Sequence, residues 1–272
     1  MRIYIAADME GVAGVMHPGQ TVPGSPEYER AALLMTGEVN AAVTGALEGG
    51  AREVWVADGH GGYRNVLLEH LHPQARLIAG KPRPGGMLAG LEATGPWDGI
   101  FLLGYHARAG SSGVLAHTIN SKAFALVSVD GQAVGEALLS AAVAGEQGIA
   151  VLLVSGDDCL VREVEMFLPD VSTVTVKQSL AWRAAMHLPI PLVRENLRRA
   201  AAQAVGLSGK PYVLTSPVRV EVTTVQPVQA DAFALVPGVE RLHPSTVGFE
   251  AANATRLMGM LNVFSLMAGG LQ

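Results

Sequence analysis

Potential metal ligands follow three apolar segments that have the length of buried β-strands. Asp8 and Glu10 end the segment "IYIAADME", His60 ends "EVWVADGH" and His106 ends "GIFLLGYH". Open α/β folds bind ligands beyond the carboxyl ends of their strands, so we expect these side chains to meet in one crevice. Carboxylate and imidazole groups together are the ligand types that zinc accepts. The spacing therefore predicts a metal site.

Asp8 and Glu10 are two residues apart, and side chains at that spacing on a strand point the same way. Both carboxylates could then grip one cation. The alternative is that they cap the helix that follows, as acidic side chains often do. Gly11 and Gly14 in "EGVAG" favour a site, because glycine lets the backbone turn sharply and approach a ligand.

His60 lies in "DGHGG", where three glycines leave the imidazole without a packing role. The alternative is a tight turn that merely carries a histidine. Asp58 could itself bind a metal or could orient His60 from behind, and we favour orientation.

His106 and His117, in "GYHAR" and "LAHTIN", are eleven residues apart and could lie at the two ends of one loop. Taken singly, each could equally be a buried, hydrogen-bonded histidine. Glu136 lies in "AVGEALL", and the pattern alone predicts an acidic residue on a helix surface; Glu146 fits that description better.

Composition limits the classes of function. The chain has 272 residues, 49% of them hydrophobic, and a net charge of −5 with scattered Lys and Arg, so we expect no nucleic acid partner. The apolar segment before Asp8, "IYIAA", is too short for the hydrophobic region of a signal peptide. No apolar run reaches the length that a membrane span requires. We expect a soluble, cytoplasmic protein without a membrane partner. Its one cysteine, Cys159, is interpreted as an inert, partly buried thiol.

Strand-length apolar runs alternate with alanine-rich segments, which indicates a βα pattern. The runs cover residues 2–7, 53–57, 99–104, 123–129 and 149–154, and a long helix is predicted within 26–50. Strands that are apolar throughout suit a sheet covered on both faces. The predicted fold class is α/β, with a three-layer sandwich around a mostly parallel sheet.

The C-terminal part has a different pattern. A helix over 191–205 precedes the alternating segment "VRVEVTTVQ", which is typical of a half-exposed strand. We therefore predict a metal-binding catalytic domain over 1–188 and a smaller α+β subdomain over 189–272. The loop "AGKPRPGGM" at 79–87 is expected beside the site, with Lys81 and Arg83 as solvated surface charges.

Five segments in the same order identify a family resemblance. They are "AADMEG", "ADGHGG", "GYHARAG", "LAHTIN" and "AVGEALL". On the basis of these segments, the chain as a whole resembles the DppA-type D-aminopeptidases of peptidase family M55.

The resemblance implies a dinuclear zinc centre with two zinc ions per subunit. Asp8 would bridge the metals, Glu10 and His60 would complete one site, and His106 and Glu136 the other. His117 matches the family's catalytic histidine. The family forms ring-like homo-oligomers, including decamers, and cleaves N-terminal D-amino acids from small peptides and amides. Tyr105, Asn120 and Lys122 are candidates, by their position in the sequence, for the walls that select the substrate.

Two zinc ions about 3.5–4 Å apart can hold a hydroxide at neutral pH and polarise a scissile carbonyl. His117 could then move a proton to the departing amine or support the oxyanion, because its ordinary pKa lies near neutrality. Manganese or cobalt could occupy the same ligands.

Two other functions remain open from the sequence. A dinuclear phosphoesterase would use the same ligands and would need a cation such as Arg108 or Lys122 beside them. A non-catalytic metal-binding protein would have closed coordination. A serine hydrolase is disfavoured, because "GSSG" at 110–113 lacks the G-x-S-x-G pattern. The function that we predict is a zinc-dependent aminopeptidase for small peptides.

Overall fold

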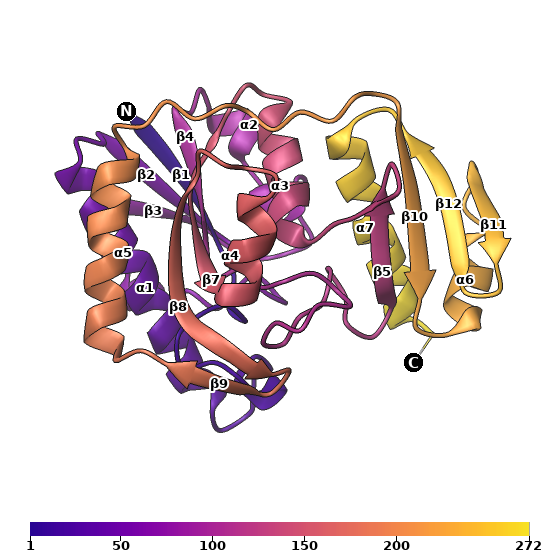
Figure 1. The fold of residues 1–272 in the computed structure, drawn as a ribbon, viewed down its shortest axis with the longest axis horizontal. Helices are drawn as coiled ribbons and strands as arrows, with labels where there is room; N and C mark the ends of the chain where they lie inside the picture. The colour runs from indigo at the N-terminus through magenta and orange to yellow at the C-terminus, as the bar shows by residue number, and fades with distance from the viewer. Residues whose placement is uncertain (272) are drawn as a thin grey trace.

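The computed structural model describes residues 1–271, which form two β-sheets (Figure 1). Sheet A is parallel except for its last strand, β9, and has the order β3-β2-β1-β4-β7-β8-β9. Its strands are β1 (Arg2–Ala7), β2 (Glu53–Asp58), β3 (Ala75–Ile78), β4 (Gly99–Leu103), β7 (Val151–Asp157), β8 (Ser172–Ala181) and β9 (Ala184–His187).

Sheet B is antiparallel and has the order β11-β12-β10-β5-β6. Its strands are β5 (Phe124–Val129), β6 (Gln132–Ala133), β10 (Val218–Thr224), β11 (Val239–His243) and β12 (Thr246–Ala251). In β10 every second residue is fully buried, as the alternating sequence predicts for a sheet with one covered face.

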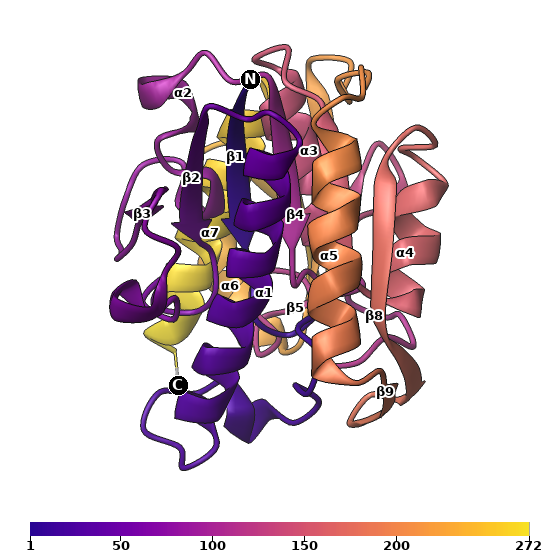
Figure 2. The same ribbon diagram turned by 90° about the vertical axis from the view of Figure 1, so that its left-hand side faces the viewer.

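Helices cover both faces of sheet A. Helices α1 (Tyr28–Glu48) and α5 (Ile190–Ala204) lie side by side on one face (Figure 2), where Ile3 and Ile5 of β1 pack against them. Helices α3 (Glu136–Gly145) and α4 (Asp158–Glu165) share the other hydrophobic core with Tyr4. Strand β1 is therefore apolar on both faces because both faces are covered.

Helix α3 also faces the second sheet. Every residue of α3 is buried, and it packs against α7 (Ala254–Gly269), which lies between α3 and sheet B (Figure 1). The carboxylate of Glu146, just after α3, accepts hydrogen bonds from the first backbone N–H groups of α7. Glu146 is exposed, as predicted, but it also ties the two helices together. The remaining helices are α2 (Leu91–Thr94), α6 (Pro227–Phe233) and the short 3-10 turns η1 (Pro18–Gln20), η2 (Leu68–His70) and η3 (Gly86–Leu88).

The predicted fold class is confirmed: sheet A is mostly parallel, lies between helices and is accompanied by a smaller antiparallel sheet. The strand expected at 123–129 exists, but it pairs with β10 in sheet B instead of joining the parallel sheet. Helix α5, which we grouped with the C-terminal subdomain, packs on α1. The boundary near residue 189 stays a prediction: all strands of sheet A precede it, whereas sheet B takes strands from both sides of it.

Among the described residues, no helix combines the length and the apolar character that crossing a bilayer requires.

The order of strands in sheet A creates a crevice at the carboxyl end of β1. The chain moves from β1 to β2 and β3 in one direction, then returns to β4 on the other side of β1. At such a reversal, neighbouring connections leave in opposite directions and a binding crevice opens.

Two glycines let the loops after β1 and β4 touch through their backbones. The N–H of Gly11 donates to the carbonyl of Gly104 at 2.8 Å. A Cβ on Gly11 would lie 1.8 Å from the carbonyl oxygen of Tyr105, and one on Gly104 would lie 2.2 Å from that of Asp8. The close approach places Asp8 next to the loop that carries His106.

We expect Gly11→Ala to lower the free energy of unfolding by about 2 kcal/mol or more, because its methyl group would overlap backbone atoms that cannot move independently. Gly259→Ala is the matched control: Gly259 is exposed on α7 and has no atom near its missing Cβ, so alanine should stabilise the helix by about 0.5–1 kcal/mol. Denaturant unfolding of both variants measures the difference. Equal stability of Gly11→Ala and the wild type would contradict the required contact.

Candidate metal centre

The structure brings the six predicted site residues together at the carboxyl edge of sheet A. Asp8 and Glu10 follow β1, His60 follows β2, and His106 follows β4. His117 lies in the loop between β4 and β5. Glu136 is the first residue of α3 and is buried, so it is not the surface residue that its sequence pattern alone suggested.

Asp8 occupies the centre of the cluster. Its Oδ1 lies 3.3 Å from Nδ1 of His60, and its Oδ2 lies 3.4 Å from Nε2 of His106. Glu10 Oε2 lies 2.9 Å from the same nitrogen of His60, and Glu136 Oε1 lies 3.3 Å from that of His106. The two oxygens of one carboxylate therefore face two separate histidine and glutamate pairs.

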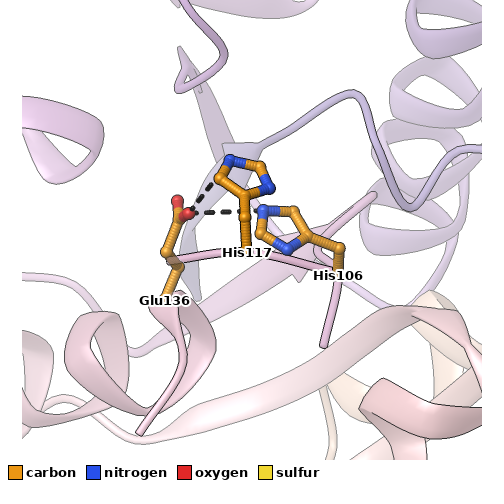
Figure 3. Close-up of side chains that lie close together, drawn as sticks. All are labelled: His106, His117 and Glu136. Carbon is orange, nitrogen blue, oxygen red and sulfur yellow. Dashed lines mark ion pairs between the residues drawn. The ribbon is translucent and has the colours of Figure 1, made fainter. Parts of the chain in front are cut away.

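His117 stacks on His106, with ring centroids 4.1 Å apart and planes inclined by 9° (Figure 3). Its Nε2 lies 3.7 Å from Oε1 of Glu136. The side chain of His117 is 16% exposed, whereas that of His106 is 1% exposed. His117 is thus the histidine of this pair that solvent or a substrate can reach.

Backbone carbonyls orient all three imidazoles. A carbonyl oxygen can only accept a hydrogen bond, so the ring nitrogen facing it must carry the proton, and the other nitrogen is free to bind a cation. The nitrogens facing carbonyls are Nε2 of His60, 2.9 Å from Thr21, Nδ1 of His106, 3.0 Å from Ala107, and Nδ1 of His117, 2.9 Å from Leu115. In each ring the remaining nitrogen is the one that faces the carboxylates.

The donor set fits a metal ion. Oδ2 of Asp8, Oε2 of Glu10 and Nε2 of His106 are buried and have no hydrogen-bond partner within residues 1–271. Such groups are rarely left unpaired in a folded protein. Asp8, Glu10 and His106 offer ligand atoms within 4.8 Å of one another, as do His106, His117 and Glu136. A cation at each group of atoms would satisfy them.

Opposite charges within the cluster, taken together, shift the pKa values of its members more than burial does. Burial by itself would raise the pKa of Asp8, but the nearby imidazoles of His106 and His60 hold that pKa below its usual range. Burial likewise would lower the pKa of His106, but Glu136 and Asp8 raise it well above 6.5. Asp8 therefore stays ionised and attracts positive charge, which is either a proton on an imidazole or a bound cation.

Asp58 organises the loop that carries His60. Its carboxylate accepts hydrogen bonds from the N–H of His60 at 3.3 Å, the side-chain amide of Asn65 at 2.7 Å and the N–H of Val66 at 2.7 Å. Asp58 therefore holds the backbone of the "DGHGG" segment, whereas the carbonyl of Thr21 contacts the His60 ring.

Lys177 of β8 holds the loop that carries Glu10, and the sequence interpretation did not identify it. Its Nζ is buried and donates to the carbonyls of Glu10 at 2.5 Å, Val12 at 2.9 Å and Val15 at 2.6 Å. The available signal was a lysine within the valine-rich segment "TVTVKQ". On the same loop, the N–H of Ala13 donates to the buried carboxylate of Glu38 at 2.8 Å.

The loops around the site contain residues in the left-handed region. The φ angles of Leu115 and Ile119, on either side of His117, are 53° and 61°, and that of Tyr63, just after the His60 loop, is 57°. This conformation costs energy for residues with a side chain, above all a β-branched one, and tends to occur at functional sites. At Ile119 it directs the N–H to Oε1 of Glu136 at 2.7 Å.

A cavity of about 430 Å³ opens beside the ligands. Glu136 and Ile119 line it together with Tyr63, the 81–87 loop and residues 262–266 of α7. The 81–87 loop does lie beside the site, but Arg83 is not a solvated charge as expected. It is half-buried because its guanidinium donates to the carbonyls of Ile78 and Gly86, at 3.1 and 3.0 Å.

The other candidates from the sequence have structural partners. Tyr105 is fully buried and its hydroxyl lies 3.2 Å from that of Ser140, so it forms no wall of the cavity. Asn120 donates to the hydroxyl of Ser265 on α7 at 3.0 Å. Burial raises the pKa of the Cys159 thiol, in agreement with an inert cysteine.

Comparisons with known proteins agree with the sequence resemblance. The model of the M55 peptidase family, described as D-aminopeptidase, matches residues 1–263. A D-aminopeptidase of Bacillus subtilis (strain 168) is 36% identical over 256 residues, or 92% of each chain. The solved structure of the Zn-dependent D-aminopeptidase DppA from Bacillus subtilis, described as a self-compartmentalizing protease, superposes with a TM-score of 0.94 at 33% identity and 98% coverage of both chains.

Glu38→Gln should stabilise the protein at pH 8 but not at pH 4.5. Burial, the largest effect, raises the pKa of Glu38 from 4.5 to about 7, so the folded chain keeps a proton that the unfolded chain loses near pH 4.5. The wild type therefore loses stability as the pH rises from 4.5 to 7, by up to about 3 kcal/mol, whereas glutamine does not titrate.

Denaturant unfolding of the metal-stripped proteins at both pH values measures the difference in free energy of unfolding between Glu38→Gln and the wild type. Glu29→Gln, on the exposed face of the same helix, removes the same charge from a solvated position and is the control. A difference between Glu38→Gln and the wild type that is the same at pH 4.5 and pH 8 would contradict the raised pKa.

Proposed function

The chain belongs to peptidase family M55, the D-aminopeptidases, and from that premise we propose that it is a zinc-dependent aminopeptidase that removes an N-terminal D-amino acid from small peptides or amides. The observation that carries the proposal is the position of Asp8. Its two carboxylate oxygens face two histidine and glutamate pairs, which is the arrangement that a bridging ligand between two metals requires.

The proposed ligands divide around Asp8. Glu10 and His60 would hold one zinc ion, and His106 and Glu136 the other, with Asp8 shared. Two histidines and three carboxylates suit zinc, which accepts mixed nitrogen and oxygen ligation. Bound zinc would supply an activated water as the nucleophile and polarise the scissile carbonyl.

His117 would move the proton that the departing amine needs. The carbonyl of Leu115 holds its Nδ1, so Nε2 is the nitrogen that faces the cluster. Stacking on His106 fixes the plane of the ring. An imidazole with one exposed and correctly oriented nitrogen can take up a proton and deliver it at neutral pH.

The cavity beside Glu136 suits a small peptide. Its volume of about 430 Å³ falls in the range of sites for small molecules. The phosphoesterase alternative would need a cation at the ligands. Of the two cations that we considered for that role, Arg108 donates from its guanidinium to the carbonyl of Ala109 at 2.9 Å. Lys122 is exposed and is not among the residues that line the cavity.

We also propose that the chain forms a ring-shaped homo-oligomer, such as a decamer, in the cytoplasm. The description of the related DppA structure as self-compartmentalizing supports assembly. Exposed apolar side chains around β8 and β9 support it as well, namely Leu180, Trp182, Met186 and Leu188. Light scattering on the purified protein would measure the oligomer.

Zinc-loaded protein should contain two zinc ions per chain and hydrolyse D-alanine p-nitroanilide faster than the L-isomer, and a chelator should abolish both the zinc content and the turnover. Elemental analysis and release of p-nitroaniline measure these quantities in one preparation. Faster turnover of the L-isomer would retain the chemistry and reject the D-preference. Zinc without any amide hydrolysis would reject the proposed function.

His117→Ala should keep both zinc ions but lose about 10²–10⁴-fold in kcat, because it removes a proton-transfer group and no ligand. His106→Ala is the comparison and should lose zinc as well as activity. Both variants are measured by zinc content and kcat under the same conditions. Loss of zinc in His117→Ala would assign His117 to the ligands instead.

A further inference from the structure

Two cations lie over one aromatic ring in the wall of the active-site cavity. Nζ of Lys81 is 5.2 Å and the guanidinium carbon of Arg83 is 4.3 Å from the centroid of Tyr63. All three residues line the same cavity as Glu136. The cavity thus joins the cluster of metal-ligand candidates to a positively charged wall.

The two cations differ in what they already bind. The guanidinium of Arg83 donates to three backbone carbonyls, those of Ile78, Gly86 and Asp58, so it holds the loop in place. Lys81 is exposed, as expected from the sequence, and its ammonium forms no ion pair or hydrogen bond with another described residue. Lys81 is therefore the cation with donors left for a ligand.

No acidic side chain in the described lining balances this charge. Glu136 is the one acid among the lining residues, and its Oε1 faces His106 and accepts from the N–H of Ile119. The charges in the cavity are therefore separated, with carboxylates at the metal ligands and cations on the loop. A negatively charged group on a ligand would be attracted to the loop.

A short free peptide has that charge distribution. If its first peptide bond lies at the ligands, the residues after that bond extend into the cavity, and in a di- or tripeptide they end in a carboxylate. We propose that Lys81, beside the Arg83 guanidinium, binds the C-terminal carboxylate of the substrate and so selects short free peptides over longer or amidated ones. This inference rests on the proposed aminopeptidase function.

The fold supports a recognition role for Lys81. The ring of Tyr63 beneath the two cations attracts positive charge and keeps both side chains on the cavity wall. Pro82 and Pro84 restrict the backbone on either side of Arg83, so less freedom is lost when a carboxylate binds. Asn262 and Ser265 of α7 add polar groups to the cavity lining.

The test compares D-alanyl-D-alanine with its C-terminal amide, which lacks only the negative charge. For Lys81→Met, we expect the ratio of kcat/KM for the free dipeptide to that for the amide to fall about tenfold, as expected for loss of one charge-assisted contact that is partly exposed. Lys81→Arg should restore most of the ratio. Lys210→Met removes the same charge from an exposed position outside this cavity and should leave the ratio unchanged.

A binding measurement separates this inference from the proposed function. The reduced isostere of the dipeptide, with CH2–NH in place of the scissile amide, cannot be hydrolysed and can be titrated by calorimetry into zinc-loaded protein. Its Kd should rise about tenfold in Lys81→Met and remain the same in Lys210→Met.

The outcomes are distinct. If the wild type and Lys81→Met hydrolyse the free dipeptide with the same preference over the amide, the role of Lys81 is overturned and the aminopeptidase function is retained. Isostere binding that depends on Lys81, without hydrolysis of either substrate, would retain the carboxylate site and overturn the function.

Discussion

The carboxylate of Asp8, buried between the imidazoles of His60 and His106, is the interaction on which the site depends. A buried charge is costly unless partners surround it, so the fold must bring opposite charge to both oxygens. It does so by ending β1 between β2 and β4 and by letting Gly11 and Gly104 meet through their backbones. The side chains of the site converge because these three strands end at one edge.

Support for this arrangement comes from both sheets. Sheet A carries Asp8 and the two histidines beside it, whereas Glu136 follows β6 of sheet B and begins the buried helix α3. Helix α7, which packs on α3, contributes Asn262, Ser265 and Leu266 to the cavity lining. Sheet B therefore contributes to the site, since it positions one candidate ligand and the surface that a substrate would meet.

The sequence predicted β1, β2, β4 and β7 of sheet A and the residues that follow β1, β2 and β4, because apolar runs mark buried strands and parallel strands end at a common edge. It did not predict β3, β8 or β9. It could not predict that β5 would join sheet B, since that choice depends on pairing with β10, almost a hundred residues later. Lys177 was missed for a related reason: its partners are three backbone carbonyls, which every residue has and which no sequence pattern marks. The left-handed conformations of Leu115 and Ile119 were equally invisible, because neither residue type favours them.

The carbonyls that orient the three histidines have a consequence for how the site can change during evolution. A side chain that orients a ligand can be lost by one mutation, and the ligand then loses its direction and part of its basicity. Here the oxygens of Thr21, Ala107 and Leu115 belong to the main chain, so replacement of those side chains leaves the acceptors in place. Substitutions at these positions therefore leave the protonation pattern of the imidazoles unchanged. The surrounding side chains can change to suit new substrates while the ligands keep their chemistry.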